Sequence, residues 1–217
     1  MQPPKPPKLV GPLRWCAGIL LVGGAVGGII AINHNGKLEQ GNAAPAAIKG
    51  KASTLMVARK HGTCVDSVQN PLRWNADVET GDRISCFNRH YAERAGSWLT
   101  TDFIANEQGR QEPIIFYDSV TSKPLFQAPV GRSWDQFIQE STKHGWPSFR
   151  DQEVITDDTR VLEDGEVVSM DGTHLGHNLP DGKGNRYCIN LVCVAGQPPK
   201  AGVVEGGERV LRVRRGR

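Results

Sequence analysis

The chain has 217 residues, 38% of them hydrophobic and 23% charged, which is enough for one ordinary packed domain with appendages. A formal net charge of +3 is too small to indicate nucleic-acid binding. The 25 glycines and 14 prolines predict many turns and little long helix.

The N-terminal region predicts a membrane anchor. Residues 1–14 are Pro-rich and basic, and residues 15–32 carry no charged side chain. That apolar run just reaches the minimum length of a membrane span and is longer than the usual core of a signal peptide. We therefore expect an uncleaved single-pass transmembrane helix over residues 15–32 rather than a cleaved signal peptide. The chain would then be a membrane protein on the endomembrane or secretory route, with an organelle membrane as the alternative.

Composition also marks the ends of the folded domain. Residues 33–54 are small, polar and rich in Ala, Pro and Gly, which is typical of a linker. A folded domain is expected over residues 55–196. A flexible basic tail follows over residues 197–217, and its arginines could alternatively contact anionic lipid or another acidic partner.

The predicted elements of the domain are short. Residues 83–98 have helix-like content that ends at Gly96, and residues 113–126 predict a strand, a turn and a second strand. Residues 154–170 contain two strand candidates around an Asp-Gly turn. The domain is therefore expected to consist mostly of short strands with one or two short helices.

One amphipathic helix is predicted between Ser133 and Gly145. Trp134, Phe137 and Ile138 have the i, i+3, i+4 spacing of one helical face. Ser133 is a suitable N-cap, and Gly145 can end the helix.

The most informative stretch is residues 171–193, where turn residues separate two extended segments. Asp-Gly and Gly-Asn pairs suit the positive-φ positions of a hairpin. The connection is therefore expected to bring His174 and His177 back beside Cys188. Histidines in that position can accept or donate protons near neutral pH. They could also cap local turns.

In the second extended segment, Arg186, Cys188 and Asn190 point to the same face because side chains alternate along a strand. A guanidinium on the same face as a thiol stabilises the thiolate, which is the nucleophilic form of cysteine. The pattern predicts a cysteine nucleophile with acid–base partners. The alternative for a lone cysteine in an apolar strand is a small buried hydrophobic residue.

We expect no metal site. The chain has no C-x-x-C pair, which argues against a four-cysteine zinc site. His174 and His177 could combine with Cys188 and Cys193 as four donors. However, the two cysteines are separated by an odd number of positions and would face opposite sides of a regular strand.

Several motifs in one order resemble the methionine-R-sulfoxide reductase B family. They are GWPSF at residues 145–149, HLGH at residues 174–177, the PDG that contains Asp181, and RYCIN at residues 186–190. The resemblance implies a mainly β fold in which two antiparallel sheets enclose a shallow pocket, with a few short peripheral helices. Here the N-terminal transmembrane helix would precede that fold.

The resemblance also implies roles for individual residues. Cys188 would be the nucleophile that reduces methionine-R-sulfoxide, free or within an oxidised protein, and would become a sulfenic acid. Trp146, with Phe149 beside it, would pack against the methyl group of the substrate. The polar side of the pocket would comprise His174, His177, Asp181, Arg186 and Asn190.

The chain departs from the family in its other cysteines. Many members hold zinc through two C-x-x-C pairs, and many carry a resolving cysteine where this chain has Lys143 and His144. We therefore expect a zinc-free form without a bound cofactor, which an external thiol reductant regenerates, either thioredoxin-like or a small thiol. Cys86, or else Cys64, is expected to resolve the oxidised Cys188. The alternatives are a structural Cys64–Cys86 disulfide and direct reduction by a small thiol.

A different class of function stays open. A membrane-tethered binding protein could keep the same pocket without turning over its ligand.

Overall fold

The computed structural model describes residues 30–32, 38–40 and 43–200. The chain divides into two compact units, residues 1–41 and residues 42–217. In the first unit, β1 (Ile30–Ile32) pairs with β2 (Leu38–Gln40) in antiparallel fashion. The second unit contains all the other elements and every candidate site residue.

The predicted fold class was wrong because it included a transmembrane helix. Ile30–Ile32, at the end of the predicted span, form a strand whose backbone pairs with β2 instead of continuing a helix. Among the described residues, no helix combines the length and the apolar character that crossing a bilayer requires. The rest of the predicted span (15–29), the basic N-terminus (1–14) and residues 201–217 of the predicted tail lie outside the described residues.

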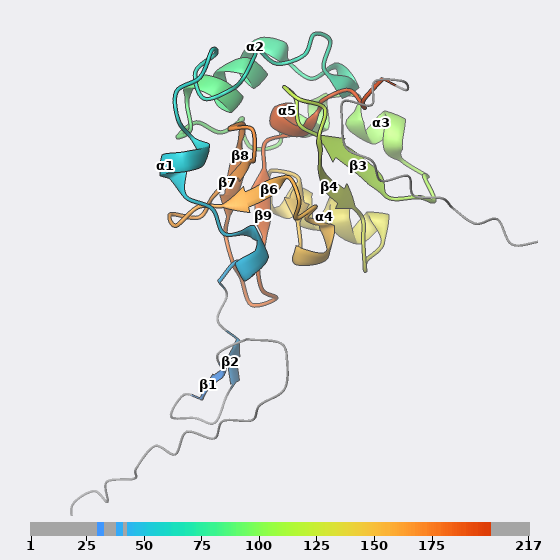
Figure 1. Cartoon of the computed structure of the whole chain (residues 1–217). Coiled ribbons are helices and arrows are strands. Elements are labelled where there is room, and N and C mark those ends of the chain that lie inside the picture. Colours follow the sequence, from blue (N-terminus) through green and yellow to red (C-terminus); the bar gives the residue numbers. More distant parts are fainter. Residues whose placement is uncertain (1–29, 33–37, 41–42, 201–217) are drawn as a thin grey trace, which may run out of the picture. The chain divides into compact units, whose positions relative to one another are not determined.

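The described part of the second unit contains two antiparallel sheets (Figure 1). A two-stranded sheet pairs β3 (Ile114–Tyr117) with β4 (Pro124–Ala128). The larger sheet has the strand order β5-β9-β8-β7-β6. Its members are β5 (Ser148–Phe149), β6 (Thr159–Val161), β7 (Glu166–Ser169), β8 (His174–Asn178) and β9 (Tyr187–Ile189). The β8–β9 pair is the hairpin that the Asp-Gly and Gly-Asn pairs predict.

The longest described helix is α4 (Trp134–His144), and its ends follow the sequence signals. The Ser133 side chain accepts a hydrogen bond from the Gln136 backbone, and Gln136 reaches back to Ser133, which completes a capping box. Gly145 ends the helix at φ 90°, a conformation that favours glycine. Phe137 is buried on the inner face, so the predicted amphipathic pattern is confirmed.

The remaining helical segments are single turns around the sheets. They are η1 (Ala46–Ile48), α1 (Ala52–Leu55), η2 (Arg73–Asn75), α2 (Val78–Asp82), η3 (Arg83–Phe87), η4 (Ser97–Thr100), α3 (Phe103–Glu107), η5 (Asp151–Glu153) and α5 (Leu191–Val194). Ile48 is buried and Gly50 donates a backbone hydrogen bond to Val161 of β6. The folded unit therefore begins within the residues predicted as a linker.

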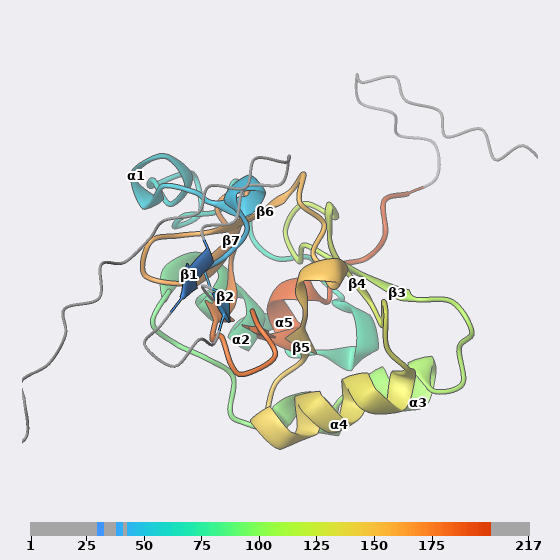
Figure 2. The same ribbon diagram turned by 90° about the horizontal axis from the view of Figure 1, so that it is seen from below.

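An aromatic core joins the two sheets and α4. The ring of Phe149 on β5 stacks on Phe126 of β4 with centroids 4.4 Å apart, and it meets Phe116 of β3 at 4.9 Å. Phe103 of α3 contacts Trp134 of α4 at 5.7 Å, and Figure 2 shows the two helices along one side of the unit. This core fixes β5, which forms one border of the candidate site.

Candidate functional site

Cys188 lies at the centre of β9, between β5 and β8. The register places Ser148 of β5 opposite Cys188 on one side and His177 of β8 on the other. His177 in turn lies opposite Glu166 of β7. Directly opposite residues share a face of an antiparallel sheet. Ser148, Cys188, His177 and Glu166 therefore form one row of side chains across four strands, and we call it the thiol row.

A bulge in β8 brings a second histidine to the same face. His174 and His177 are three residues apart and would face opposite sides of a regular strand. The pairing of β8 with β7 shifts so that Val167 lies opposite Gly176 and Val168 opposite His174. This extra residue puts both imidazoles together, with ring centroids 5.6 Å apart. Gly176 is required there, because a Cβ would lie 2.0 Å from the carbonyl oxygen of Cys188.

Glu166 anchors the buried histidine and carries a negative charge. Its Oε1 lies 2.7 Å from Nδ1 of His174, and the Nε of Arg89 is 3.0 Å from both carboxylate oxygens. Burial would raise the pKa of Glu166, but the hydrogen bonds from His174 and Arg89 outweigh it and lower that pKa to about 2. Glu166 is only 2% exposed, so it is a buried anion held by two partners.

His177 is the histidine nearest the thiol in the register. Burial lowers its pKa, and the charge of the neighbouring His174 lowers it further. A lowered pKa favours the neutral imidazole at physiological pH. His177 is therefore suited to accept a proton from a group beside it.

An arginine contacts the thiol directly. Nη1 of Arg186 lies 2.5 Å from Sγ of Cys188, and its Nε lies 3.4 Å from Asp181. Asp181 also accepts from Arg150 at 3.0 and 2.9 Å, and these hydrogen bonds hold its pKa well below the usual range. Arg150 bridges onward to Glu140. Asp181 therefore acts on the thiol indirectly, by helping to orient the guanidinium of Arg186.

Asn190 and Trp146 are joined through hydrogen bonds to Glu93. The Asn190 side chain accepts from the Glu93 backbone at 2.9 Å and donates to the Leu175 carbonyl at 3.1 Å. The carbonyl of Glu93 accepts from Nε1 of Trp146 at 3.0 Å. The carboxylate of Glu93 is also buried, and this burial raises its pKa. It accepts a hydrogen bond from the backbone N–H of Val192 in α5. Asn190 is thus a positioning group, and Trp146 is a partly buried wall held in place.

Phe149 is not at the surface of the site. Because neighbours on a strand face opposite sides, Ser148 faces Cys188 while Phe149 faces the aromatic core. The ring is fully buried. The substrate contact expected of Phe149 is therefore replaced by a packing role under the thiol row.

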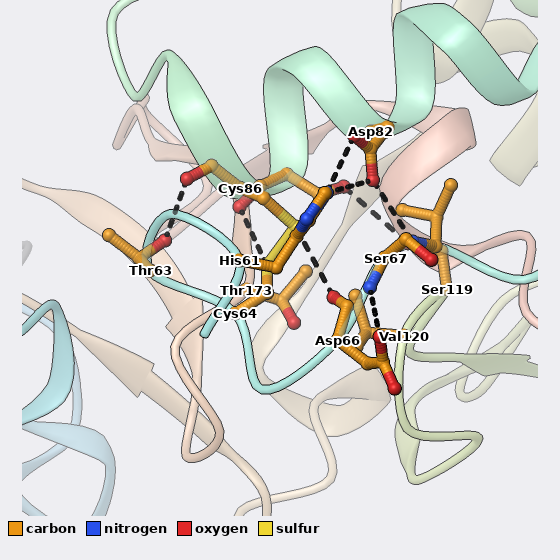
Figure 3. Close-up of a disulfide and its surroundings, with 12 residues drawn as sticks. His61, Thr63, Cys64, Asp66, Ser67, Asp82, Cys86, Ser119, Val120 and Thr173 are labelled. Carbon is orange, nitrogen blue, oxygen red and sulfur yellow. Dashed lines mark hydrogen bonds and ion pairs between the residues drawn. A yellow bond between two sulfur atoms is a disulfide. The ribbon is translucent and has the colours of Figure 1, made fainter. Parts of the chain in front are cut away.

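The two cysteines expected to resolve Cys188 are joined to each other. Cys64 and Cys86 form a disulfide with Cα atoms 5.2 Å apart, and both are buried (Figure 3). The Thr63 backbone donates to the carbonyl of Cys86 at 2.9 Å beside it. This is the structural disulfide of the alternative prediction, so neither residue offers a thiol.

Cys193 does not lie on a strand with Cys188. β9 ends at Ile189, and Cys193 sits in the helical turn α5. It is fully buried, and burial raises the pKa of its thiol well above the ordinary value. The prediction that Cys188 and Cys193 lie on one strand was wrong. Cys193 is nevertheless buried away from the site, as the prediction required.

Among the described residues, two groups of side chains have the composition of a metal site. His61, Asp82 and Cys86 form one, but the sulfur of Cys86 is in the disulfide and His61 is paired with Asp82. The other consists of Glu140, His144 and Asp181. There the guanidinium of Arg150 lies between the two carboxylates, so a cation would have to displace it. Neither group includes His174, His177 or Cys188.

Two of the hollows in the described structure are lined by residues outside the thiol row. One, of about 630 Å³, is lined by Glu93, His90 and Tyr91 among others. The other, of about 970 Å³, is lined by Asp181, Arg150 and further residues of α4 and the β8–β9 turn. Cys188 lines neither of them. The thiol itself is partly buried.

Four residues of the site were missed at the level of sequence: Glu166, Arg89, Ser148 and Glu93. The available signal for Glu166 was a charged residue at the start of the strand candidate 166–169. Arg89 and Glu93 come from a loop remote in sequence, and no local pattern connects them to the histidines.

No protein-family model matches the chain, and no curated protein matches it. The likeness to the methionine-R-sulfoxide reductase B family therefore rests on the sequence motifs alone.

Proposed function

We propose that the chain is a peptide-methionine (R)-S-oxide reductase that uses Cys188 as its nucleophile. The observation that carries the proposal is the thiol row, in which Cys188 lies between Ser148 and His177 with Nη1 of Arg186 at 2.5 Å from its sulfur. A thiol beside a cation and a neutral imidazole has the partners that nucleophilic catalysis requires.

The residues divide the first step among them. Arg186 stabilises the thiolate, and His177 accepts the thiol proton. The thiolate attacks the sulfoxide sulfur and forms an S–S bond. The oxygen takes up a proton from His177 and moves to the sulfur of Cys188, while the S–S bond and the substrate S–O bond break. The substrate sulfur gains two electrons and leaves as the thioether of methionine. Cys188 loses two electrons and becomes a sulfenic acid.

The buried anion supports the proton transfer. Glu166 lies opposite His177 and bonds His174, so its charge favours the imidazolium that forms on His177. The carboxylate thus orients His174 through a hydrogen bond and acts on His177 through its charge. Trp146, held by the Glu93 carbonyl, offers an aromatic face to the substrate methyl and sulfur.

The test is turnover of the full chain on the separate R and S epimers of methionine sulfoxide with a dithiol reductant. We expect activity on the R epimer alone and its loss in Cys188→Ser. Cys193→Ala is the matched control, because it removes the other free described thiol from a buried position. Equal rates on the two epimers, or a Cys188→Ser chain that still turns over, would contradict the proposal.

A binding protein that keeps the pocket without turnover is the second candidate. One observation favours it: Cys64 and Cys86, expected to regenerate the thiol, are locked in a disulfide. A single-turnover experiment without reductant separates the two. About one methionine released per chain supports the reductase, and retained sulfoxide supports binding.

A further inference from the structure

We propose that one hollow of the described structure binds an acidic side chain that flanks methionine sulfoxide in a peptide or protein substrate. The proposal rests on the proposed function and names the class of its substrate: peptide-bound methionine sulfoxide with an aspartate or glutamate close by in the sequence. The hollow has a volume of about 630 Å³, which is within the range of ligand sites. We call it the arginine hollow, and its charged and aromatic lining consists of Asp77, Arg83, His90, Tyr91, Glu93 and Arg94.

The loop that follows η3 joins the arginine hollow to the candidate site. At the start of the loop, Nε of Arg89 lies 3.0 Å from both carboxylate oxygens of Glu166, a member of the thiol row. At its end, the backbone carbonyl of Glu93 accepts a hydrogen bond from Nε1 of Trp146, the proposed wall for the substrate methyl group. Both ends of this short loop are therefore bonded to residues of the site.

The middle of the same loop borders the arginine hollow. His90 and Tyr91 line the hollow together with Glu93, and Tyr91 is 50% exposed. Burial and, to a smaller extent, the charge of His90 lower the pKa of His177, so the loop also acts electrostatically on the thiol row. Since Glu93 both lines the hollow and holds Trp146, a peptide whose methionine sulfoxide packs on Trp146 places its neighbouring residues at the border of the hollow.

The acidic side chains of the arginine hollow are bonded to the protein itself. Asp77 caps α2, where it accepts a hydrogen bond from the backbone of Thr80 at 2.7 Å. The carboxylate of Glu93 is buried and accepts from the backbone of Val192 and from the hydroxyl of Ser97. Both carboxylates therefore serve the local fold.

The arginines of the hollow lack such partners. Among the residues that the structure describes, no carboxylate forms an ion pair with Arg83 or Arg94, and both arginines are exposed. Hydrogen bonds from Thr80 and then the charge of Arg83 lower the pKa of Asp77, so the attraction between Arg83 and Asp77 acts without ion-pair contact. A guanidinium has N–H donors spaced to match the two oxygens of a carboxylate. The hollow is therefore suited to an acidic side chain supplied by a ligand.

Tyr91 restrains one of these guanidinium groups. Cζ of Arg83 lies 4.8 Å from the centroid of the Tyr91 ring, which is a cation–π contact. Because the ring limits the motion of the long arginine side chain, less conformational entropy is lost when a carboxylate binds. An acidic flanking residue should consequently bind more tightly than a neutral one of the same shape.

Binding is measured on the full chain carrying Cys188→Ser, so that the sulfoxide stays intact during the titration. The probes are fluorescent pentapeptides with methionine-R-sulfoxide at the centre and glutamine at the flanking positions, in which one glutamine at a time is replaced by glutamate. We expect one or two positions at which glutamate lowers Kd about fivefold, the upper range for an exposed ion pair. This gain should shrink in about 0.5 M salt, which screens exposed charges.

Charge variants assign the preference to the arginine hollow. Arg83→Gln/Arg94→Gln should bring the two Kd values close together, and Arg83→Lys/Arg94→Lys should keep part of the difference. The matched control is Lys143→Gln/Lys183→Gln, which removes two positive charges from the lining of the other hollow and should preserve the difference. Equal affinity or no binding at every position overturns the proposal. It is also overturned if the preference survives in the Arg83→Gln/Arg94→Gln chain or disappears in the lysine control.

Failure of the proposed function looks different. In that case, the chain with Cys188 leaves the sulfoxide of every peptide unreduced in the presence of a dithiol, whereas the Cys188→Ser chain still binds the glutamate peptides more tightly. Reduction of all the peptides without any preference for glutamate in binding would overturn the proposal about the arginine hollow alone.

Discussion

Removing the Cys64–Cys86 disulfide should cost the folded unit about 3 kcal/mol. The bond joins residues separated by 22 positions. In the chain-entropy treatment, closing a loop of that length removes about 11 cal/mol/K from the unfolded ensemble, or about 3 kcal/mol at 25 °C. Loss of two buried sulfur atoms in Cys64→Ala/Cys86→Ala adds a packing loss in the same direction.

Urea unfolding of the double variant measures this cost directly. The free energy of unfolding should fall by about 3 kcal/mol, and the melting temperature by roughly 6–12 °C for a domain of this size. The single variant Cys193→Ala is the control for loss of one buried sulfur without loss of a cross-link. A decrease below about 1 kcal/mol would refute the reasoning. It would mean that non-covalent contacts such as His61–Asp82 already close the loop in the denatured chain.

Three further predictions concern the site. Glu166 has a pKa of about 2 in the fold against an ordinary 4.5, so it contributes stability that is present above pH 4.5 and is lost as pH falls toward 2. As pH falls through this range, the free energy of unfolding should decrease by about 3 kcal/mol because of Glu166. Glu166→Gln should remove this part of the pH dependence. An unchanged pH profile in the variant would be inconsistent with a buried anion. Replacing Arg186 by Met should slow alkylation of Cys188 by iodoacetamide about tenfold, while Arg186→Lys should retain part of the rate. Trp146→Ala should raise KM for methionine-R-sulfoxide more than it lowers kcat, with Trp146→Phe intermediate, and a pure kcat effect would argue against a binding wall.

The sequence predicted those helices and turns whose ends depend only on neighbouring residues. Ser133 and Gly145 mark the limits of α4 because capping and left-handed termination depend on neighbouring residues only. The hairpin that returns His177 to Cys188 follows from its turn residues in the same way. The prediction of a common face for Arg186 and Cys188 is confirmed by the contact between them.

The remainder depends on tertiary contacts. Arg89 bonds Glu166 although the two residues are 77 positions apart, and no helical or strand periodicity of the sequence predicts such a pair. Alternation alone would have separated His174 from His177, and only the pairing with β7 reveals the bulge that reunites them. The helix predicted over residues 15–32 was wrong at its described end for a related reason. Apolar content sets a hydropathy pattern, but Ile30–Ile32 take the strand conformation through pairing with β2.

Strand alternation in β9 also limits which insertions and deletions the chain can accept. Cys188 faces His177, while Tyr187 and Ile189 on either side are buried in the core. A single residue added to the turn between Asn178 and Tyr187, if absorbed by sliding β9, would bury the thiol and turn an apolar side chain toward the histidines. Two added residues would restore the parity of the faces. Where β9 slides to absorb the change, length variation in this turn should therefore be tolerated in steps of two, whereas its composition is free to change at the exposed positions.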